Sequence, residues 1–166
     1  MELTLIDARA TPRTRAALRR LFPMYIHDLS PHTTFYALDT RARWMPQLWR
    51  DWLANPHIDP WLFEHKGQLA GFAIVAHQPF PHMSPDRHHK LCEFFILAGQ
   101  RRQGVGAAAA ARVFDLYAGG WELTVLPTNL VAIAFWRRAV TGYTRHRFDE
   151  VQLPGDILIR FDSARL

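Results

Sequence analysis

Two neighbouring stretches of the sequence decide the fold: Leu91-Cys92-Glu93-Phe94-Phe95-Ile96-Leu97 and Arg101-Arg102-Gln103-Gly104-Val105-Gly106. The first is a nearly continuous apolar run, as expected for a central strand that is covered on both faces. The second opens an alanine-rich segment, Gly104 to Ala118, which Gly119-Gly120 terminates and which therefore predicts a helix. Together they predict a buried strand that turns tightly into a helix.

Outward from this unit, strand and helix patterns alternate along the chain. Lys66-Gly67 and Pro154-Gly155 each separate two apolar runs, which indicates two hairpins. Thr11-Pro12 is a good N-cap and first-turn pair for a helix. We expect strands at 3–6, 61–65, 68–77 and 121–126 and two more after Tyr143, with helices at 13–25, within 44–52 and at 130–139. This order predicts an α/β (α+β) fold in which a mixed sheet has helices on both faces.

Length and composition exclude several classes of protein. The 166 residues, 49% hydrophobic and 21% charged, predict one globular domain spanning 1–166 rather than a disordered chain. Cys92 is the only cysteine, which excludes an intramolecular disulfide and a cysteine-rich zinc cluster and fits a reducing, cytoplasmic setting. Neither a signal peptide nor a membrane-spanning run is apparent, so we expect a soluble protein without a membrane partner.

The charge balance points to an anionic partner. Twenty Lys and Arg against fifteen Asp and Glu give a net charge of +5. Nucleic acid, an anionic membrane surface and a polyphosphate cofactor all fit such a balance. The arginines at 13, 15, 19 and 20 form either a solvated helix face or, as an alternative, a nucleic-acid-binding face.

The turn at Arg101 to Gly106 has the features of an anion site. The first amides of a helix lack intrahelical partners, and glycine lets backbone approach a phosphate closely. The alternative is a tight turn that binds nothing. A P-loop would need Gly-Lys-Ser/Thr, which is missing, and Val125-Leu126 is followed by no acid of the kind that a dinucleotide-binding fold requires.

These residues resemble the GCN5-related N-acetyltransferase (GNAT) family, which uses acetyl-CoA. Arg101-x-x-Gly104-x-Gly106 matches its Arg/Gln-x-x-Gly-x-Gly/Ala motif. Asn129-x-x-Ala132-x-x-Phe135-Trp136, followed by Gly142-Tyr143, is similar to the family's later helix. The resemblance covers roughly 90–143 and does not indicate the acceptor.

The resemblance implies a site for acetyl-CoA. The amides from Arg102 to Ala107 would hold the pyrophosphate, the strand at Ile96 and Leu97 would pair with the pantetheine arm, and Asn129 would bind that arm. Strand 121–125 would diverge from 94–97 and admit the thioester. The implied cofactor-binding residues are Ile96, Leu97, Arg101, Arg102, Gln103, Gly104, Val105, Gly106, Ala107, Asn129 and Trp136.

Trp136 departs from the family pattern, because many relatives have a tyrosine there that protonates the leaving thiolate. An indole N–H does not give up its proton near neutral pH. Either another group, such as Tyr143 or water, supplies this proton, or the thiolate leaves unprotonated.

Acetyl transfer to an amine needs a base and a donor to the developing oxyanion. We expect Glu93 to be the base, since its apolar neighbours should raise its pKa. The alternative is that Glu93 pairs with a cation or lies at a wet strand end. The backbone N–H of Ile96 or Leu97 would be the oxyanion donor under the family geometry. His77 and the cluster Tyr25-x-His27-Asp28 are lesser candidates.

Two other groups of side chains leave alternatives open. His82, His88 and His89 lack a further ligand nearby in sequence, so we expect no metal. The aromatic residues of the segment before the first hairpin serve either as an acceptor pocket or as ordinary core; they are Phe35, Tyr36, Trp44, Trp49 and Trp52.

The sequence therefore predicts an acetyl-CoA-dependent N-acetyltransferase that works by direct transfer in a ternary complex. Cys92 lies between apolar neighbours and should be an unreactive thiol. The acceptor would be a small-molecule or peptide amine, and no nucleic-acid partner is expected. The alternatives are an acyl-CoA-binding module without turnover and a basic nucleic-acid-binding domain. The apolar run Ile157-Leu158-Ile159 fits either a homodimer surface or a core strand.

Overall fold

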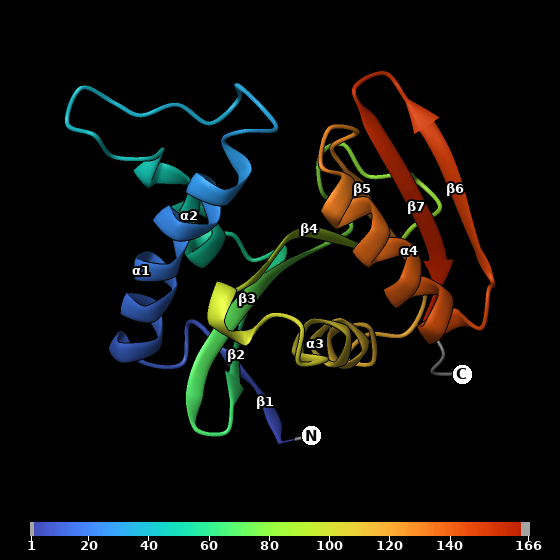
Figure 1. Cartoon of the computed structure of the whole chain (residues 1–166), viewed down its shortest axis with the longest axis horizontal. Coiled ribbons are helices and arrows are strands. Elements are labelled where there is room, and N and C mark those ends of the chain that lie inside the picture. The colour runs from blue at the N-terminus through green and yellow to red at the C-terminus, as the bar shows by residue number, and fades with distance from the viewer. Residues whose placement is uncertain (1, 164–166) are drawn as a thin grey trace.

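The computed structural model describes residues 2–163, and within them seven strands form one mixed sheet. Helices α1 and α2 cover one face and α3 and α4 the other (Figure 1). The predicted fold class is therefore confirmed. In chain order the elements are β1 (Leu3–Asp7), α1 (Pro12–Leu29), α2 (Pro46–Ala54), β2 (Ile58–His65), β3 (Gln68–His77), β4 (His89–Ile96), the 3-10 turn η1 (Ala98–Gln100), α3 (Val105–Phe114), β5 (Gly120–Val125), α4 (Leu130–Thr144), β6 (Phe148–Leu153) and β7 (Asp156–Asp162).

Helix α1 begins at the predicted cap and extends beyond the predicted end. Thr11 caps it reciprocally with Thr14. The helix continues to Leu29 because Phe22 and Ile26, one turn apart, are both buried in the core that α1 and α2 form with the sheet. The arginines at 13, 15, 19 and 20 lie on its exposed side.

Helices α3 and α4 differ from their predicted lengths. Helix α3 ends at Phe114 instead of Ala118. The N–H of Leu116 donates to the Val113 carbonyl three residues back, so the four-residue hydrogen-bond ladder of α3 ends with Asp115. Helix α4 continues past Ala139 to Thr144 and stops at Arg145, which adopts a left-handed conformation.

Strands β4 and β5 are the one parallel pair in the order β1-β2-β3-β4-β5-β7-β6 of the described sheet. Their pairing covers three residue pairs and ends at Leu91 and Leu123. Beyond that point the two strands continue without pairing, so the predicted divergence of this strand pair is confirmed. The sheet is consequently open at its centre.

A bulge in β4 sets the direction of its side chains. Ile74 pairs with Glu93 and Val75 with Leu91, which leaves Cys92 as an extra residue in β4. Leu91 and Phe94 pack in the core under α3 and α4, whereas Cys92 packs against the core under α1 and α2. The bulge thereby places Glu93 on the same face as Cys92, where regular alternation would have turned it to the other face.

The run Ile157-Leu158-Ile159 lies in β7 between β5 and β6 and is buried. It therefore serves as a core strand, and the sequence argument for a homodimer through this run loses its basis. None of the helices in residues 2–163 is long and apolar enough to span a membrane.

Gly71 is required where the backbone of β3 lies close to that of the paired strand β4. A Cβ at this position would lie 1.9 Å from the backbone oxygen of Phe95, which cannot move without disrupting the sheet. We expect Gly71→Ala to lower the free energy of unfolding by about 3 kcal/mol in urea titrations. Gly142→Ala is the control, since Gly142 is an exposed helical residue with open space around it. That change should be neutral or stabilise by up to about 1 kcal/mol. Equal effects of the two changes would contradict this account.

Candidate active site

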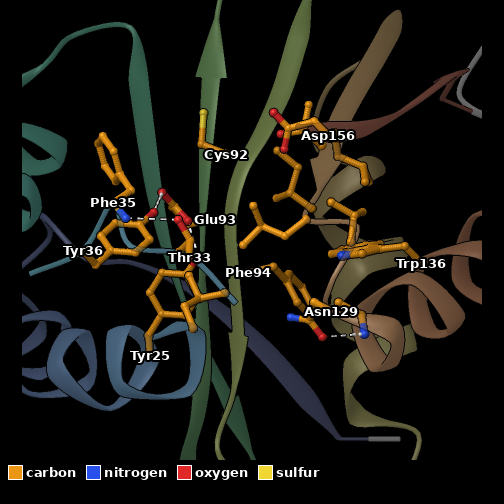
Figure 2. Close-up of a pocket in the computed structure, with 17 residues that line it drawn as sticks. Tyr25, Thr33, Phe35, Tyr36, Cys92, Glu93, Phe94, Asn129, Trp136 and Asp156 are labelled. Atoms are coloured by element: carbon orange, nitrogen blue, oxygen red, sulfur yellow. Dashed lines mark hydrogen bonds between the residues drawn. The ribbon is translucent and has the colours of Figure 1, made fainter. Parts of the chain in front are cut away.

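A cavity of about 330 Å³ lies where β4 and β5 diverge (Figure 2). One side is formed by Tyr25 of α1 and by Phe35 and Tyr36 of the segment between α1 and α2. The opposite side is formed by Asn129, the N-cap of α4, and by Trp136 within that helix. The cavity thus joins elements from both faces of the sheet at its central opening.

Glu93 projects from β4 into this cavity, where two tyrosines contact its carboxyl group. Tyr25 donates a hydrogen bond to Oε2, and the Tyr36 hydroxyl lies 3.5 Å from Oε1. Desolvation raises the pKa of Glu93 to about 7, although the two hydroxyls partly offset this rise. The prediction of a perturbed carboxyl group is confirmed, whereas the alternative of a cation partner or a wet strand end is not.

The two tyrosines are held protonated beside Glu93. Burial and, after it, the charge of Glu93 raise the pKa of both phenols above the ordinary value. They therefore act as hydrogen-bond donors to the carboxyl group at neutral pH. Tyr25 was a lesser sequence candidate, and the structure places it in direct contact with Glu93.

Burial raises the pKa of the neighbouring Cys92 thiol to about 12. A thiol with this pKa is almost entirely protonated at neutral pH and is a poor nucleophile. This agrees with the expectation of an unreactive cysteine.

The backbone N–H groups of β4 point alternately toward β3 and toward the opening. The N–H of Leu97 donates to the carbonyl of Ala70 on β3, so it points away from the opening. Because direction alternates along a strand, the N–H groups of Phe94 and Ile96 point toward the opening. The Leu97 N–H is therefore unable to donate to the oxyanion or to pantetheine, and both predictions are wrong for this group. The Ile96 N–H points toward the opening, as the predicted role requires.

The turn before α3 has the backbone that the glycine motif predicts. Arg102 and Gly104 have φ angles of +62° and +78°, and Gly104 is the N-cap of α3. The amides of Val105, Gly106 and Ala107 belong to the first helical turn and have no intrahelical acceptor. The positive end of the helix dipole adds to their attraction for an anion.

Gly106 has a packing role that the sequence did not indicate. A Cβ there would lie 3.1 Å from the Phe135 ring and 3.6 Å from the Ile96 side chain. The absence of a side chain therefore permits close contact of α3 with α4 and β4. Of the two glycines, Gly104 is the one that the turn conformation requires.

Arg101 does not extend toward the first turn of α3, contrary to expectation. Its Nε donates to the Ile96 carbonyl at 2.8 Å, and its Nη2 forms an ion pair with Asp28 of α1. These contacts occupy the guanidinium at the end of β4. Gln103 likewise donates to the Gly99 carbonyl, while Arg102 is exposed.

Asn129 and Trp136 lie on the far side of the cavity from Glu93 (Figure 2). The Asn129 Oδ1 accepts from the Ala132 N–H and so caps α4, which leaves its amide nitrogen for other contacts. Trp136 packs edge-on against Phe94 at 5.0 Å and against Phe135 at 4.8 Å. These rings pack in or against the core on the α3 and α4 face of the sheet, beside the opening between the strands.

Tyr143 does not line the cavity, contrary to its candidacy as the general acid. Its hydroxyl donates to Asp115 at 2.9 Å, and its ring packs against Phe114 and Phe161 under the sheet. The prediction is therefore wrong. Helix α4 continues through Tyr143, so this residue lies about two helical turns from Trp136 and outside the cavity.

The histidine candidates lie outside the cavity, whereas the aromatic candidates lie partly in it. His77 bonds to His89 and Asp59 at the far end of β3, outside the cavity. No group of potential metal ligands is found in residues 2–163. The aromatic segment divides between the two alternatives: Phe35 and Tyr36 line the cavity, Trp52 is buried in the core, and Trp44 and Trp49 pack against that core.

Comparison with known proteins identifies a sequence family. Residues 22–141 match the profile of the acetyltransferase (GNAT) family. A search against curated protein sequences gives no significant match.

Comparison with solved structures shows the same fold. An acetyltransferase from Thermus thermophilus superposes with a TM-score of 0.71 at 15% identity, over 98% of this chain and 97% of the other. A structure described as a histone acetyltransferase and related acetyltransferase from Corynebacterium glutamicum gives 0.72 at 14% identity, over 100% and 99%. The Bacillus subtilis acetyltransferase in complex with CoA gives 0.59 at 10% identity, over 97% and 99%.

The raised pKa of Glu93 predicts a pH-dependent effect on stability. In the unfolded chain the Glu93 carboxyl group loses its proton above the ordinary pKa of a glutamic acid, whereas in the folded chain it keeps the proton until about pH 7. Ionisation of Glu93 therefore destabilises the fold as pH rises through this window. Urea titrations should find Glu93→Gln similar in stability to the wild type at about pH 5 and more stable than the wild type at about pH 8. A difference independent of pH would show that Glu93 titrates normally.

Proposed function

Because the chain belongs to the acetyltransferase (GNAT) family, we propose that it transfers the acetyl group of acetyl-CoA to an amine, with Glu93 as general base. The observation that carries this proposal is the position of Glu93, whose carboxyl group lies in the cavity at the opening between β4 and β5. Transfer is direct, within a ternary complex, because the neighbouring Cys92 thiol is held protonated.

The residues around the opening fit acetyl-CoA. The amides from Arg102 to Ala107 would hold the pyrophosphate at the start of α3. The backbone of Ile96 and the side-chain amide of Asn129 would hold the pantetheine arm, and Trp136 would pack beside it. When bound, acetyl-CoA supplies the acetyl thioester; overall, an amine N–H and the C–S bond break, and an amide C–N bond and a thiol S–H form.

Glu93 would act on the attacking amine. Its carboxylate accepts a proton from the nitrogen as that nitrogen bonds to the acetyl carbon. A pKa of about 7 leaves a substantial carboxylate fraction at neutral pH while keeping Glu93 more basic than an ordinary carboxylate. Tyr25 and Tyr36 hold the carboxyl group in place.

Backbone groups of β4 would stabilise the developing oxyanion. The N–H of Phe94 or of Ile96 faces the opening and can donate to it. Trp136 offers no proton to the leaving thiolate, and Tyr143 is bound to Asp115 outside the cavity. Water, or the proton released from the amine, would complete the thiol.

Calorimetry with acetyl-CoA tests the proposed phosphate site. Gly104→Ala should weaken binding about tenfold, because alanine relaxes the left-handed turn and displaces the amides that follow it. Gly67→Ala is the matched control, since Gly67 has a similar φ of +71° but lies in the hairpin between β2 and β3. Both variants should lose stability, and only Gly104→Ala should lose affinity. Equal affinities in the two variants would place the pyrophosphate elsewhere.

Steady-state kinetics test the base. Glu93→Gln should lower kcat about 100-fold, with acetyl-CoA affinity nearly unchanged. In the wild type, kcat should rise with pH and level off above about 7, because the carboxylate is the active form. Asp51→Asn, on the exposed side of α2, removes a negative charge outside the cavity and should leave kcat unchanged.

A nearly unchanged kcat in Glu93→Gln would remove Glu93 from the mechanism. Binding of acetyl-CoA without thiol release for any amine would instead favour an acyl-CoA-binding module. A failure of the wild type to bind acetyl-CoA at all would overturn the proposed function.

A further inference from the structure

The charges and size of the cavity indicate the chemical class of the acceptor. This inference rests on the proposed function and extends it. We propose that the acceptor is a compact primary amine with an apolar body and no carboxylate near the reacting nitrogen. The carboxyl groups of Glu93 and Asp156 select for the positive charge of an amine, and the rings of Phe35 and Tyr36 select for the apolar body.

The described residues that line the cavity include two carboxyl groups and no Lys, Arg or His side chain. The carboxyl groups are those of Glu93, from β4, and Asp156, from the start of β7. Figure 2 shows them on opposite sides of the cavity. An ammonium group entering between them is attracted by both, whereas a substrate carboxylate is repelled and finds no cationic side chain.

The cations closest in sequence to Glu93 and the end of β4 are already paired. The Lys90 ammonium lies 3.6 Å from the buried Glu122 carboxylate and donates to the His82 carbonyl. The Arg101 guanidinium is bound to Asp28 and to the Ile96 carbonyl. If Lys90 turned toward a substrate carboxylate, the buried Glu122 carboxylate would lose its cationic partner. If Arg101 did so, Asp28 would lose its partner.

The size of the cavity restricts the body of the acceptor. Its volume of about 330 Å³ is near the small end of ligand pockets and must also admit the thioester. The segment between α1 and α2 reaches across to the loop before α4, where Thr128 donates to the His32 carbonyl at 3.1 Å. Because Thr33, Phe35 and Tyr36 of this segment line the cavity, the contact limits access on that side to small molecules.

The aromatic side chains favour an apolar body over a polyhydroxylated one. Tyr25 and Tyr36 direct their hydroxyls to Glu93. The Tyr25 ring is buried against Phe72 and Phe95, whereas the half-buried Tyr36 ring offers apolar contact surface at the cavity. Phe35 packs edge-on against Tyr36 at 5.1 Å and is 69% exposed, which leaves its ring accessible beside the cavity. An ammonium near these ring faces also gains cation–π attraction.

Thiol-release kinetics with three related amines test this proposal: phenylethylamine, phenylalaninamide and phenylalanine. Phenylalaninamide and phenylalanine have nearly the same shape and differ in one negative charge. At equal concentrations of unprotonated amine, kcat/KM should be about 100-fold lower for phenylalanine than for the other two. Calorimetric titration of each amine into the protein saturated with CoA provides a second measurement, in which phenylalanine should bind weakest.

Asp156→Asn tests the specificity role of the second carboxylate. The ratio of kcat/KM for phenylalaninamide to that for phenylalanine should fall about tenfold in this variant. Asp51→Asn is the matched control and should leave the ratio as in the wild type. Both rates come from one preparation, so the ratio does not depend on the fraction of the variant that folds.

The outcomes separate this inference from the function on which it rests. Equal rates for phenylalanine and phenylalaninamide, or a preference for a peptide N-terminus, an aminoglycoside or a polyamine, would overturn the inference and leave an acetyltransferase. Absence of acetyl-CoA binding, or of thiol release with every amine tested, would overturn the proposed function and the inference with it.

Discussion

The parallel pairing of β4 with β5 ends after Leu91 and Leu123, and the cavity depends on this interruption. Further pairing would close the sheet and cover the backbone of Phe94 and Ile96. Instead, Phe94, Phe135 and Trp136 pack against one another on the α3 and α4 face of the sheet, with ring centroids 4.8 to 5.8 Å apart, beside the opening. Burial of these rings offsets the loss of ladder hydrogen bonds, and Gly106 permits the close packing of Phe135.

The bulge at Cys92 places an ionisable group beside this opening. A carboxyl group in such an environment is costly to ionise, which raises its pKa. Hydrogen bonds from the hydroxyls of Tyr25 and Tyr36 reduce the free-energy cost of ionising Glu93. They supply no positive charge, so the pKa of Glu93 stays above that of an ordinary carboxyl group. The same cavity can therefore hold a proton acceptor and an apolar body, as acetyl transfer to a compact amine requires.

Local patterns in the sequence predicted much of the fold. The apolar run at Leu91, the hairpin at Lys66-Gly67 and the turn at Gly104 each depend on adjacent residues, and each is present. The features that were missed depend on distant partners. Tyr25 and Glu93 are 68 positions apart, Arg101 and Asp28 are 73 apart, and the bulge arises from pairing with β3. Tyr143 was misplaced because the sequence did not show that α4 continues through Gly142.

Hydrogen–deuterium exchange on the wild-type protein, with and without acetyl-CoA, tests the central claim most directly. If the thioester arm enters between β4 and β5, peptides covering 93–97 and 102–108 should exchange more slowly in its presence. The hairpin of β6 and β7, which completes the sheet beyond β5, should be little affected outside Asp156. Protection elsewhere, with unchanged exchange in 93–97 and 102–108, would contradict the account.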